Sequence, residues 1–130
     1  MIDIDHFKNV NDTYGHIVGD EVIRHLSELV RVNVRETDVS GRYGGEEFAI
    51  ILADTTLAEA SIFTERLRSE VEKSVVKYND IDLQYTISLG VAEINPTITH
   101  YEAWIECADA ALYMSKEGGR NKTTLYPNQQ

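Results

Sequence analysis

The pair Gly44-Gly45 constrains the fold of this chain more than any other feature of its sequence. It lies between two apolar, β-prone segments, residues 39–43 and 48–52. Glycine accepts positive φ angles at low steric cost, so a Gly-Gly pair in this setting predicts a tight hairpin turn. The sequence therefore predicts two neighbouring antiparallel strands in this region.

Two carboxylates follow the predicted turn directly. Glu46 and Glu47 repel each other, and they precede an apolar run that favours burial. One interpretation is a solvated turn; the other is that carboxylates at the edge of a sheet hold a cation. If residues 1–4 form a neighbouring strand, Asp3 converges with the two glutamates on a hard cation such as Mg²⁺.

Periodicity and capping patterns predict three helices. Residues 20–35 carry apolar side chains at three- and four-residue steps, with Asp20 as a suitable N-cap. Residues 56–59 form a capping-box pattern that opens a second helix, and residues 99–102 form another that opens a third. Gly118-Gly119 ends the third helix.

Further strands complete a layered arrangement. Residues 1–4 are typical of the end of a strand, and residues 85–94 alternate apolar and small or polar side chains. Asn79-Asp80 turns the chain into that strand, and residues 122–126 predict a final edge strand. The order β-α-β-β-α-β-α-β describes an α+β sandwich, in which helices cover a largely antiparallel sheet.

Composition limits the class of protein. With 130 residues, of which 42% are hydrophobic, one domain with a real core is expected. The single cysteine, Cys107, rules out a disulfide within the chain and fits a reducing, cytoplasmic compartment. The net charge of −10 argues against nucleic acid as a partner, and no apolar run predicts membrane contact.

Several motifs occur in one order along the chain. They are Asp3-Ile4-Asp5-His6-Phe7-Lys8-Asn9-Val10-Asn11-Asp12, Gly15-His16, Gly19-Asp20, Gly44-Gly45-Glu46-Glu47-Phe48 and Lys116-Glu117-Gly118-Gly119-Arg120-Asn121. Together they resemble the GGDEF family of diguanylate cyclases, in the form whose signature is GGEEF. The resemblance runs through nearly the whole chain, and it implies one GGDEF domain over residues 1–130 with a ferredoxin-like, palm-type fold.

Family members normally have a helix and the first part of a strand ahead of the Asp-Ile-Asp motif. This sequence starts inside that strand. We therefore expect a domain that is truncated at its N-terminus, with apolar sheet surface left uncovered.

The resemblance implies a Mg²⁺ (or Mn²⁺) site and a catalytic pair. Its ligands would be Asp3, Glu46, Glu47 and the backbone carbonyl of Ile4. Glu46 and Glu47 would be the catalytic residues, and Glu46 would also help to deprotonate a ribose 3′-hydroxyl. Such phosphoryl chemistry needs a divalent cation to neutralise a triphosphate.

Asn11 and Asp20 are candidate readers of guanine. An amide can bond the purine edge, and a carboxylate can accept from the exocyclic amine and the ring N–H, donors that adenine lacks. The structural alternatives are a turn residue for Asn11 and a helix N-cap for Asp20. By resemblance, backbone N–H groups near Phe7 and Lys8 hold the terminal phosphates.

Lys116 and Arg120 flank the predicted end of the last helix. Cations there also favour the helix dipole, which is the structural alternative. The motif match implies that they neutralise the β- and γ-phosphates.

Arg35-Glu36-Thr37-Asp38 matches the Arg-x-x-Asp inhibitory product site of the family. An arginine can stack on guanine and hold phosphate, while an aspartate can accept from the base. The alternative is a simple i,i+3 ion pair at a helix end. Arg66 aligns with a secondary arginine of the product site.

The predicted function is that of a diguanylate cyclase. It would condense two GTP into cyclic di-GMP with release of two pyrophosphates, at the interface of a homodimer, with feedback inhibition by the product. A domain without turnover that binds GTP or cyclic di-GMP as a receptor is the main alternative. Another metal-dependent nucleotidyl transferase on a palm fold is the third.

Overall fold

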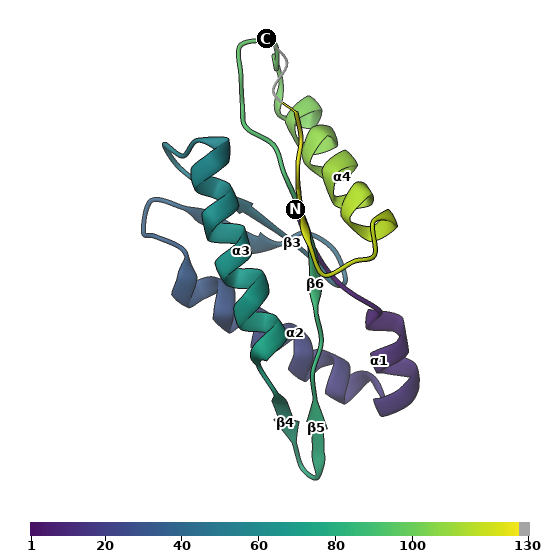
Figure 1. Cartoon of the computed structure of the whole chain (residues 1–130). Coiled ribbons are helices and arrows are strands. Elements are labelled where there is room, and N and C mark those ends of the chain that lie inside the picture. Colours follow the sequence, from purple (N-terminus) through teal and green to yellow (C-terminus); the bar gives the residue numbers. More distant parts are fainter. Residues whose placement is uncertain (128–130) are drawn as a thin grey trace.

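The computed structural model describes residues 1–127, which form a mixed sheet, a small hairpin and four helices (Figure 1). The strands are β1 Ile2–Ile4, β2 Val39–Arg42, β3 Glu47–Ile51, β4 Val76–Tyr78, β5 Ile81–Leu83, β6 Ile87–Val91 and β7 Thr123–Leu125. The helices are α1 Phe7–Tyr14, α2 His16–Asn33, α3 Leu57–Lys73 and α4 Tyr101–Glu117. Among them, no helix is long and apolar enough to cross a membrane.

The sheet confirms the predicted α+β class. Its five strands lie in the order β2-β3-β1-β6-β7, and all neighbours are antiparallel except β6 and β7. Strands β1, β2, β3 and β6 with helices α2 and α3 give the β-α-β-β-α-β succession of ferredoxin-like folds. The short strand β1 therefore lies at the centre of the sheet.

Alternation along β1 separates the core from a polar face. Ile2 pairs with Phe48 and Leu89, and all three side chains are buried. Directly paired residues share one face of a sheet, and successive residues point to opposite faces. Asp3, which pairs with Glu47 and Ser88, therefore lies on the other face.

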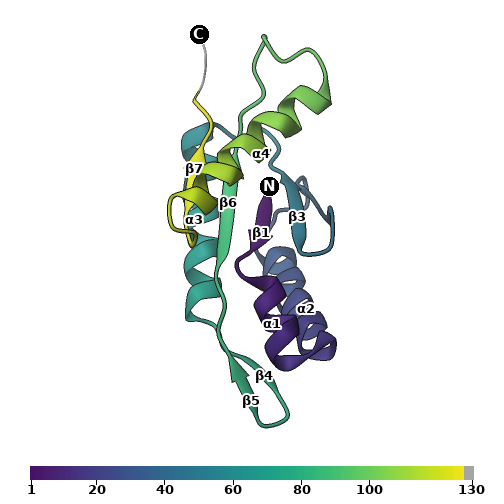
Figure 2. The same ribbon diagram turned by 90° about the vertical axis from the view of Figure 1, so that its right-hand side faces the viewer.

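Helices cover the two faces unequally. Buried residues of α2 and α3, including Leu26 and Leu67, join Ile2 in one hydrophobic cluster, whereas α4 contacts β6 and β7. Figures 1 and 2 show α2 and α3 on one side of the sheet and α4 on the other. In both views the β4–β5 hairpin extends away from the sheet, and its turn at Asn79-Asp80 was predicted.

The start of the chain is more helical than predicted. Helix α2 begins at His16, with Gly15 as its N-cap, so Asp20 lies within the helix and the predicted N-cap is wrong. Helix α1, Phe7–Tyr14, was not predicted, because it has only eight residues, most of them polar, and Val10 is its only buried residue.

Of two predicted capping boxes, one is confirmed and one is wrong, and one predicted strand is shorter than expected. The capping box at Thr56 and Glu59 is confirmed by reciprocal hydrogen bonds. Helix α4 is instead capped by His100, whose ring accepts from the Ala103 N–H, so the predicted capping box at residues 99–102 is wrong. The predicted strand at residues 85–94 is shorter, since only Ile87–Val91 pairs within the sheet.

Gly90 allows α4 to lie directly against β6. A Cβ at this position would come within 2.2 Å of both the Ala108 carbonyl oxygen and the Leu112 nitrogen. Both of these atoms belong to the backbone, which cannot rotate away as a side chain can. The distance between α4 and the polar face of the sheet is therefore set at Gly90.

Replacing Gly90 by alanine should destabilise the domain by about 1–3 kcal/mol, because the helix must shift to admit the methyl group. Urea unfolding followed by circular dichroism measures the change. The matched control is Gly41→Ala, at a site with nothing within 4 Å, where a change within about 0.5 kcal/mol is expected. Equal effects of the two substitutions would contradict the close-packing argument.

Candidate functional site

Two of the predicted carboxylates meet on the polar face of the sheet. Asp3 of β1 pairs with Glu47 of β3, and Asp3 is buried while Glu47 is half-buried. Burial, together with the negative charge of Asp3, raises the pKa of Glu47 above its usual range. The pair thus concentrates negative charge at one point.

Lys116, near the end of α4, partly balances this charge. Its Nζ forms an ion pair with Oδ2 of Asp3, and its side chain is 31% exposed. The other carboxylate oxygen of Asp3, Oδ1, is buried without a hydrogen-bond partner. A buried oxygen of this kind is an available ligand for a hard cation.

Glu46 and Ile4 are joined through their backbones, whereas Asp3 and Glu47 meet through paired positions on the sheet. The Ile4 N–H donates to the Glu46 carbonyl at 3.2 Å, which ties the hairpin turn to β1. Within residues 1–127, no three acidic, histidine or cysteine side chains gather closely enough to hold a metal ion. The structure therefore brings Asp3 and Glu47 together, and the predicted group of three carboxylates is not assembled as a set.

The proposed guanine readers lie on the helical pair α1–α2. Asn11 Oδ1 is buried without a hydrogen-bond partner, and it points at Gly19, where a Cβ would lie 1.9 Å away. Asp20 is the next residue and is exposed. The absent side chain at Gly19 thus makes room for the amide of Asn11.

Phe7 and Lys8 are the first two residues of α1. The residue before them, His6, has a left-handed φ of 55°, and the Asn9 N–H donates back to the His6 carbonyl at 3.0 Å. The amides of Phe7 and Lys8 precede this first bonded amide, as at the start of any helix. Such amides at a helix start favour anions.

Arg120 lies in the turn between α4 and β7. This turn runs through three successive residues of positive φ, namely Gly119 at 110°, Arg120 at 64° and Asn121 at 48°. Left-handed φ costs a residue with a side chain roughly 1 kcal/mol or more. Asp5, which was not predicted as a site residue, accepts a 3.0 Å hydrogen bond from the Asn121 N–H.

The spacing Asp3-Ile4-Asp5 did hold a signal for Asp5, because period two places both aspartates on one face of a strand. No local pattern could have revealed that its partner lies 116 residues away.

Arg35 and Asp38 form the i,i+3 ion pair that is the structural alternative to a product site at this motif. Arg35 donates to both carboxylate oxygens of Asp38, at 3.1 and 2.9 Å, and also to the Ala53 carbonyl and the Thr55 hydroxyl. Hydrogen bonds from Arg35 lower the pKa of Asp38 to about 2. Arg66 of α3 donates to Asn33, two residues before Arg35.

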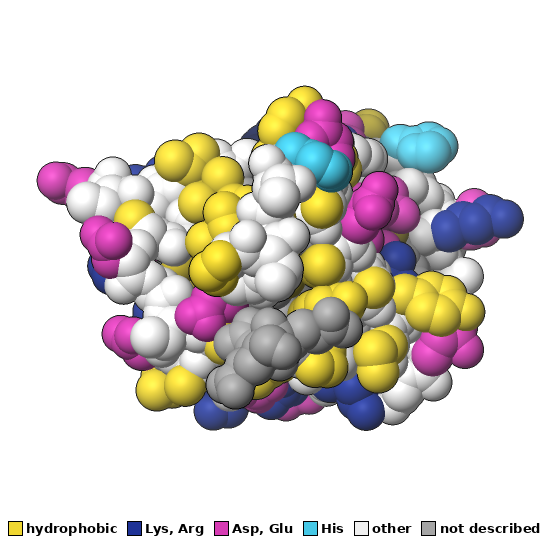
Figure 3. All heavy atoms as spheres, turned by 90° about the horizontal axis from the view of Figure 1, so that it is seen from above, with side chains coloured by type: hydrophobic (Ala, Val, Ile, Leu, Met, Phe, Trp, Pro, Cys, Tyr) yellow, Lys and Arg dark blue, Asp and Glu magenta, His cyan; other side chains and the backbone are white. Residues whose placement is uncertain are grey.

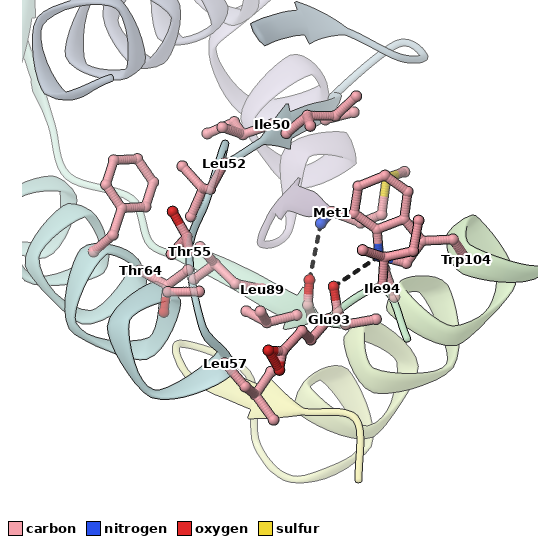
Figure 4. A pocket seen from close by; sticks show the side chains of 18 of the residues that line it. Met1, Ile50, Leu52, Thr55, Leu57, Thr64, Leu89, Glu93, Ile94 and Trp104 are labelled. Atoms are coloured by element: carbon pink, nitrogen blue, oxygen red, sulfur yellow. Dashed lines mark hydrogen bonds between the residues drawn. The ribbon is translucent and has the colours of Figure 1, made fainter. Parts of the chain in front are cut away.

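A separate apolar hollow of about 630 Å³ lies at one end of the sheet, away from the acidic pair. Met1, Leu52, Leu57 and Trp104 are among its lining residues, and none of the predicted site residues lines it (Figure 4). Figure 3, which views the molecule from above relative to Figure 1, shows apolar side chains (yellow) across the face in view. The hollow has few polar groups, and we assign it no part in the chemistry.

Comparisons with known proteins identify the family of this chain. A family model described as "Diguanylate cyclase, GGDEF domain" matches residues 1–122. The chain is 46% identical over 126 residues to a probable diguanylate cyclase, DgcC, of Escherichia coli, covering 96% of this chain and 33% of that protein. The chain thus spans about a third of the length of the curated relatives it matches.

Solved structures show the same fold. The GGDEF domain of DgcB from Caulobacter crescentus, in complex with c-di-GMP, superposes with a TM-score of 0.92 at 40% identity, covering 96% of this chain and 74% of that one. The active GGEEF domain of a diguanylate cyclase from Vibrio cholerae gives 0.90 at 31% identity, covering 98% and 81%. The chain belongs to the GGDEF domain family.

Replacing Glu47 by glutamine should stabilise the domain at pH 7 in the absence of divalent metal. The raised pKa means that the folded state disfavours the charged form. As the pH falls through the folded pKa toward the ordinary value, the wild type takes up a proton and the advantage of Glu47→Gln should shrink.

Urea unfolding at pH 7 and near pH 4 measures this difference. Glu106→Gln, an exposed site on α4, controls for the loss of one negative charge. A glutamine variant that is less stable than the wild type at pH 7, or an advantage independent of pH, would contradict the electrostatic argument.

Proposed function

We propose that this domain is a diguanylate cyclase, which joins two GTP molecules into cyclic di-GMP and releases two pyrophosphates. The observation that carries the proposal is the pairing of Asp3 and Glu47 beside Lys116 on one face of the sheet. This arrangement occurs in a chain whose relatives are named diguanylate cyclases. The two carboxylates can bind a metal cation, and the lysine can bind phosphate.

The donor set fits a hard divalent cation, because it consists of carboxylate and carbonyl oxygens and includes the unpartnered Oδ1 of Asp3. Asp3 and Glu47, which already lie together, would hold Mg²⁺ (or Mn²⁺), and the Ile4 carbonyl and the Glu46 carboxylate would join them as the ion binds. The ion would neutralise triphosphate charge and make a hydroxyl more acidic.

The protein's own residues position the reacting groups. The 3′-hydroxyl of one GTP attacks the α-phosphorus of the other, and the bond from that phosphorus to pyrophosphate breaks. Glu46 helps to take the hydroxyl proton, and Lys116 and Arg120 neutralise the charge of the leaving pyrophosphate. Catalysis by such positioning needs no covalent intermediate.

Each domain binds one GTP, so two domains must face each other for the ring to close. Asn11 and Asp20 read the guanine, and the first amides of α1, at Phe7 and Lys8, meet the terminal phosphates. The reaction thus takes place in a homodimer, and we place it in the cytoplasm. The domain requires no contact with a membrane or a nucleic acid.

The pair Arg35 and Asp38, with Arg66 nearby, forms the inhibitory site for cyclic di-GMP. Its prior organisation supports this assignment, because Asp38 already fixes the guanidinium of Arg35. The same observation favours the alternative function of a cyclic di-GMP receptor without turnover, and the DgcB domain was solved in complex with c-di-GMP.

Glu46→Gln should lower the rate of cyclic di-GMP formation by about 100-fold or more, since one carboxylate serves both proton transfer and the cation. The assay incubates concentrated domain with GTP and Mg²⁺ and separates products by chromatography. Glu106→Gln should retain the wild-type rate. A wild type that binds GTP or cyclic di-GMP but forms no product would favour the receptor.

Arg35→Ala should relieve inhibition by cyclic di-GMP while the initial rate stays close to that of the wild type. The arginine contacts Asp38 and the end of β3, away from the acidic pair. Initial rates at increasing cyclic di-GMP measure the effect, and thermal unfolding checks the fold. Arg31→Ala, which removes an exposed arginine paired with Glu28 on α2, should leave inhibition unchanged. Persistent inhibition in Arg35→Ala would exclude this site.

A further inference from the structure

Asp5 is a buried carboxylate that the proposed chemistry does not use. Its side chain is 6% exposed, and three donors meet it. Oδ1 accepts from Ser88 Oγ at 2.6 Å, and Oδ2 accepts from Thr86 Oγ1 at 2.7 Å and from the Asn121 N–H at 3.0 Å. The first two bonds join the end of β1, at Asp5, to Ser88 of β6 and to Thr86 just before it, while the third leaves the sheet for the turn that holds Arg120.

Asn121 is held from a second side by α3. Its Oδ1 accepts from Arg68 Nη1 at 2.8 Å, and its side-chain amide donates to Glu72. The residue therefore joins β1, α3 and the α4–β7 turn through both its backbone and its side chain. This network holds Arg120 and Asn121 at positive φ, which residues with side chains rarely adopt.

We propose that Asp5 and Asn121 form a clamp that fixes the turn at residues 118–121, and that the clamp thereby sets where Lys116 and Arg120 meet the terminal phosphates of GTP. Asp5 is thus a positioning residue that acts through Asn121. The inference rests on the proposed function, because that function makes the phosphates of GTP the ligands of Lys116 and Arg120.

The geometry of β1 supports this division of roles. Asp5 directly follows β1, and its N–H donates to the Thr86 carbonyl at 3.0 Å. Its carboxylate reaches Ser88, the residue that pairs with Asp3, so both aspartates lie on the same side of the sheet. Asp3 meets Lys116 directly, and Asp5 meets the turn that follows Lys116. Strand β1 and the residue that follows it therefore hold both ends of the cationic segment, and the Ser88 and Thr86 bonds keep the Asp5 carboxylate in place.

The test compares binding of two probes by calorimetry in Mg²⁺. The first is the α,β-methylene analogue of GTP, which cannot undergo attack with loss of pyrophosphate, and the second is GMP. Asp5→Ala should reduce the preference for the triphosphate over GMP by about tenfold, because charge-assisted contacts are lost. Affinity for GMP should change little, since the guanine readers lie on α1 and α2.

Asp5→Asn is the conservative variant. Its amide oxygen can accept from the Asn121 N–H and Thr86, while its NH₂ group donates to Ser88 Oγ. It should retain the wild-type preference. Ser88→Ala is the matched control, because it removes a buried bond to the same carboxylate without reaching the turn; it should lower stability and leave the preference unchanged.

If Asp5→Ala does not fold, Asn121→Gly cuts the clamp on the α3 side, leaves the core intact and still permits positive φ. It too should reduce the preference. Combining Asp5→Ala or Asn121→Gly with Arg120→Ala should add less than the separate losses, because the residues act as a unit.

An equal loss of affinity for the GTP analogue and for GMP would show that Asp5 has only a structural role, and it would overturn the inference. An unchanged preference for the triphosphate in folded Asp5→Ala or Asn121→Gly would also overturn it. In either case the wild type still prefers the triphosphate, so the proposed function stands. A wild type with no such preference would overturn the proposed phosphate contacts together with the clamp.

Discussion

The alternation of side chains along β1 is the constraint on which the rest of this structure depends. Three residues at the centre of a sheet contribute Ile2 and Ile4 to the core and Asp3 to the opposite face. A shift of one residue in register would exchange these faces, placing a carboxylate among leucines and two isoleucines beside Glu47 and Lys116. The core and the acidic pair are therefore specified together, and neither can form in another register without loss of the other.

This arrangement places negative charge where burial makes it unfavourable. Asp3 is buried beside Glu47, and Lys116 provides the nearest opposite charge. A buried carboxylate needs such partners, because desolvation opposes its ionised form. The domain as a whole is acidic, with a net charge of −10. A triphosphate can therefore approach only where lysine, arginine and helix amides outweigh that charge locally.

Sequence reasoning succeeded where the determinants are local. The hairpin at Gly44-Gly45 and the capping box at Thr56 depend on residues within a few positions of each other, and the structure contains both, although neither glycine of the hairpin has a positive φ. The Arg35–Asp38 ion pair is equally local, but it was the structural alternative to the predicted product site. Helix α1 was not predicted, since its eight residues are mostly polar and it packs against α2, a contact that the local sequence does not reveal. The contacts of Asp5 could not be predicted from the sequence either, because only the folded chain brings Ser88 and Asn121 to it.

The close contact of α4 with Gly90 fixes the position of Lys116 relative to the sheet. Leu112 touches the backbone of β6, and Lys116 follows it by four residues, hence on the same side of the helix. The Cα of Lys116 thereby lies about 6 Å farther along the helix axis, from where its ammonium reaches Asp3. Substitutions on the outer side of α4 leave this spacing intact. One residue inserted between Leu112 and Lys116 would turn the lysine about 100° around the axis and remove it from the acidic pair.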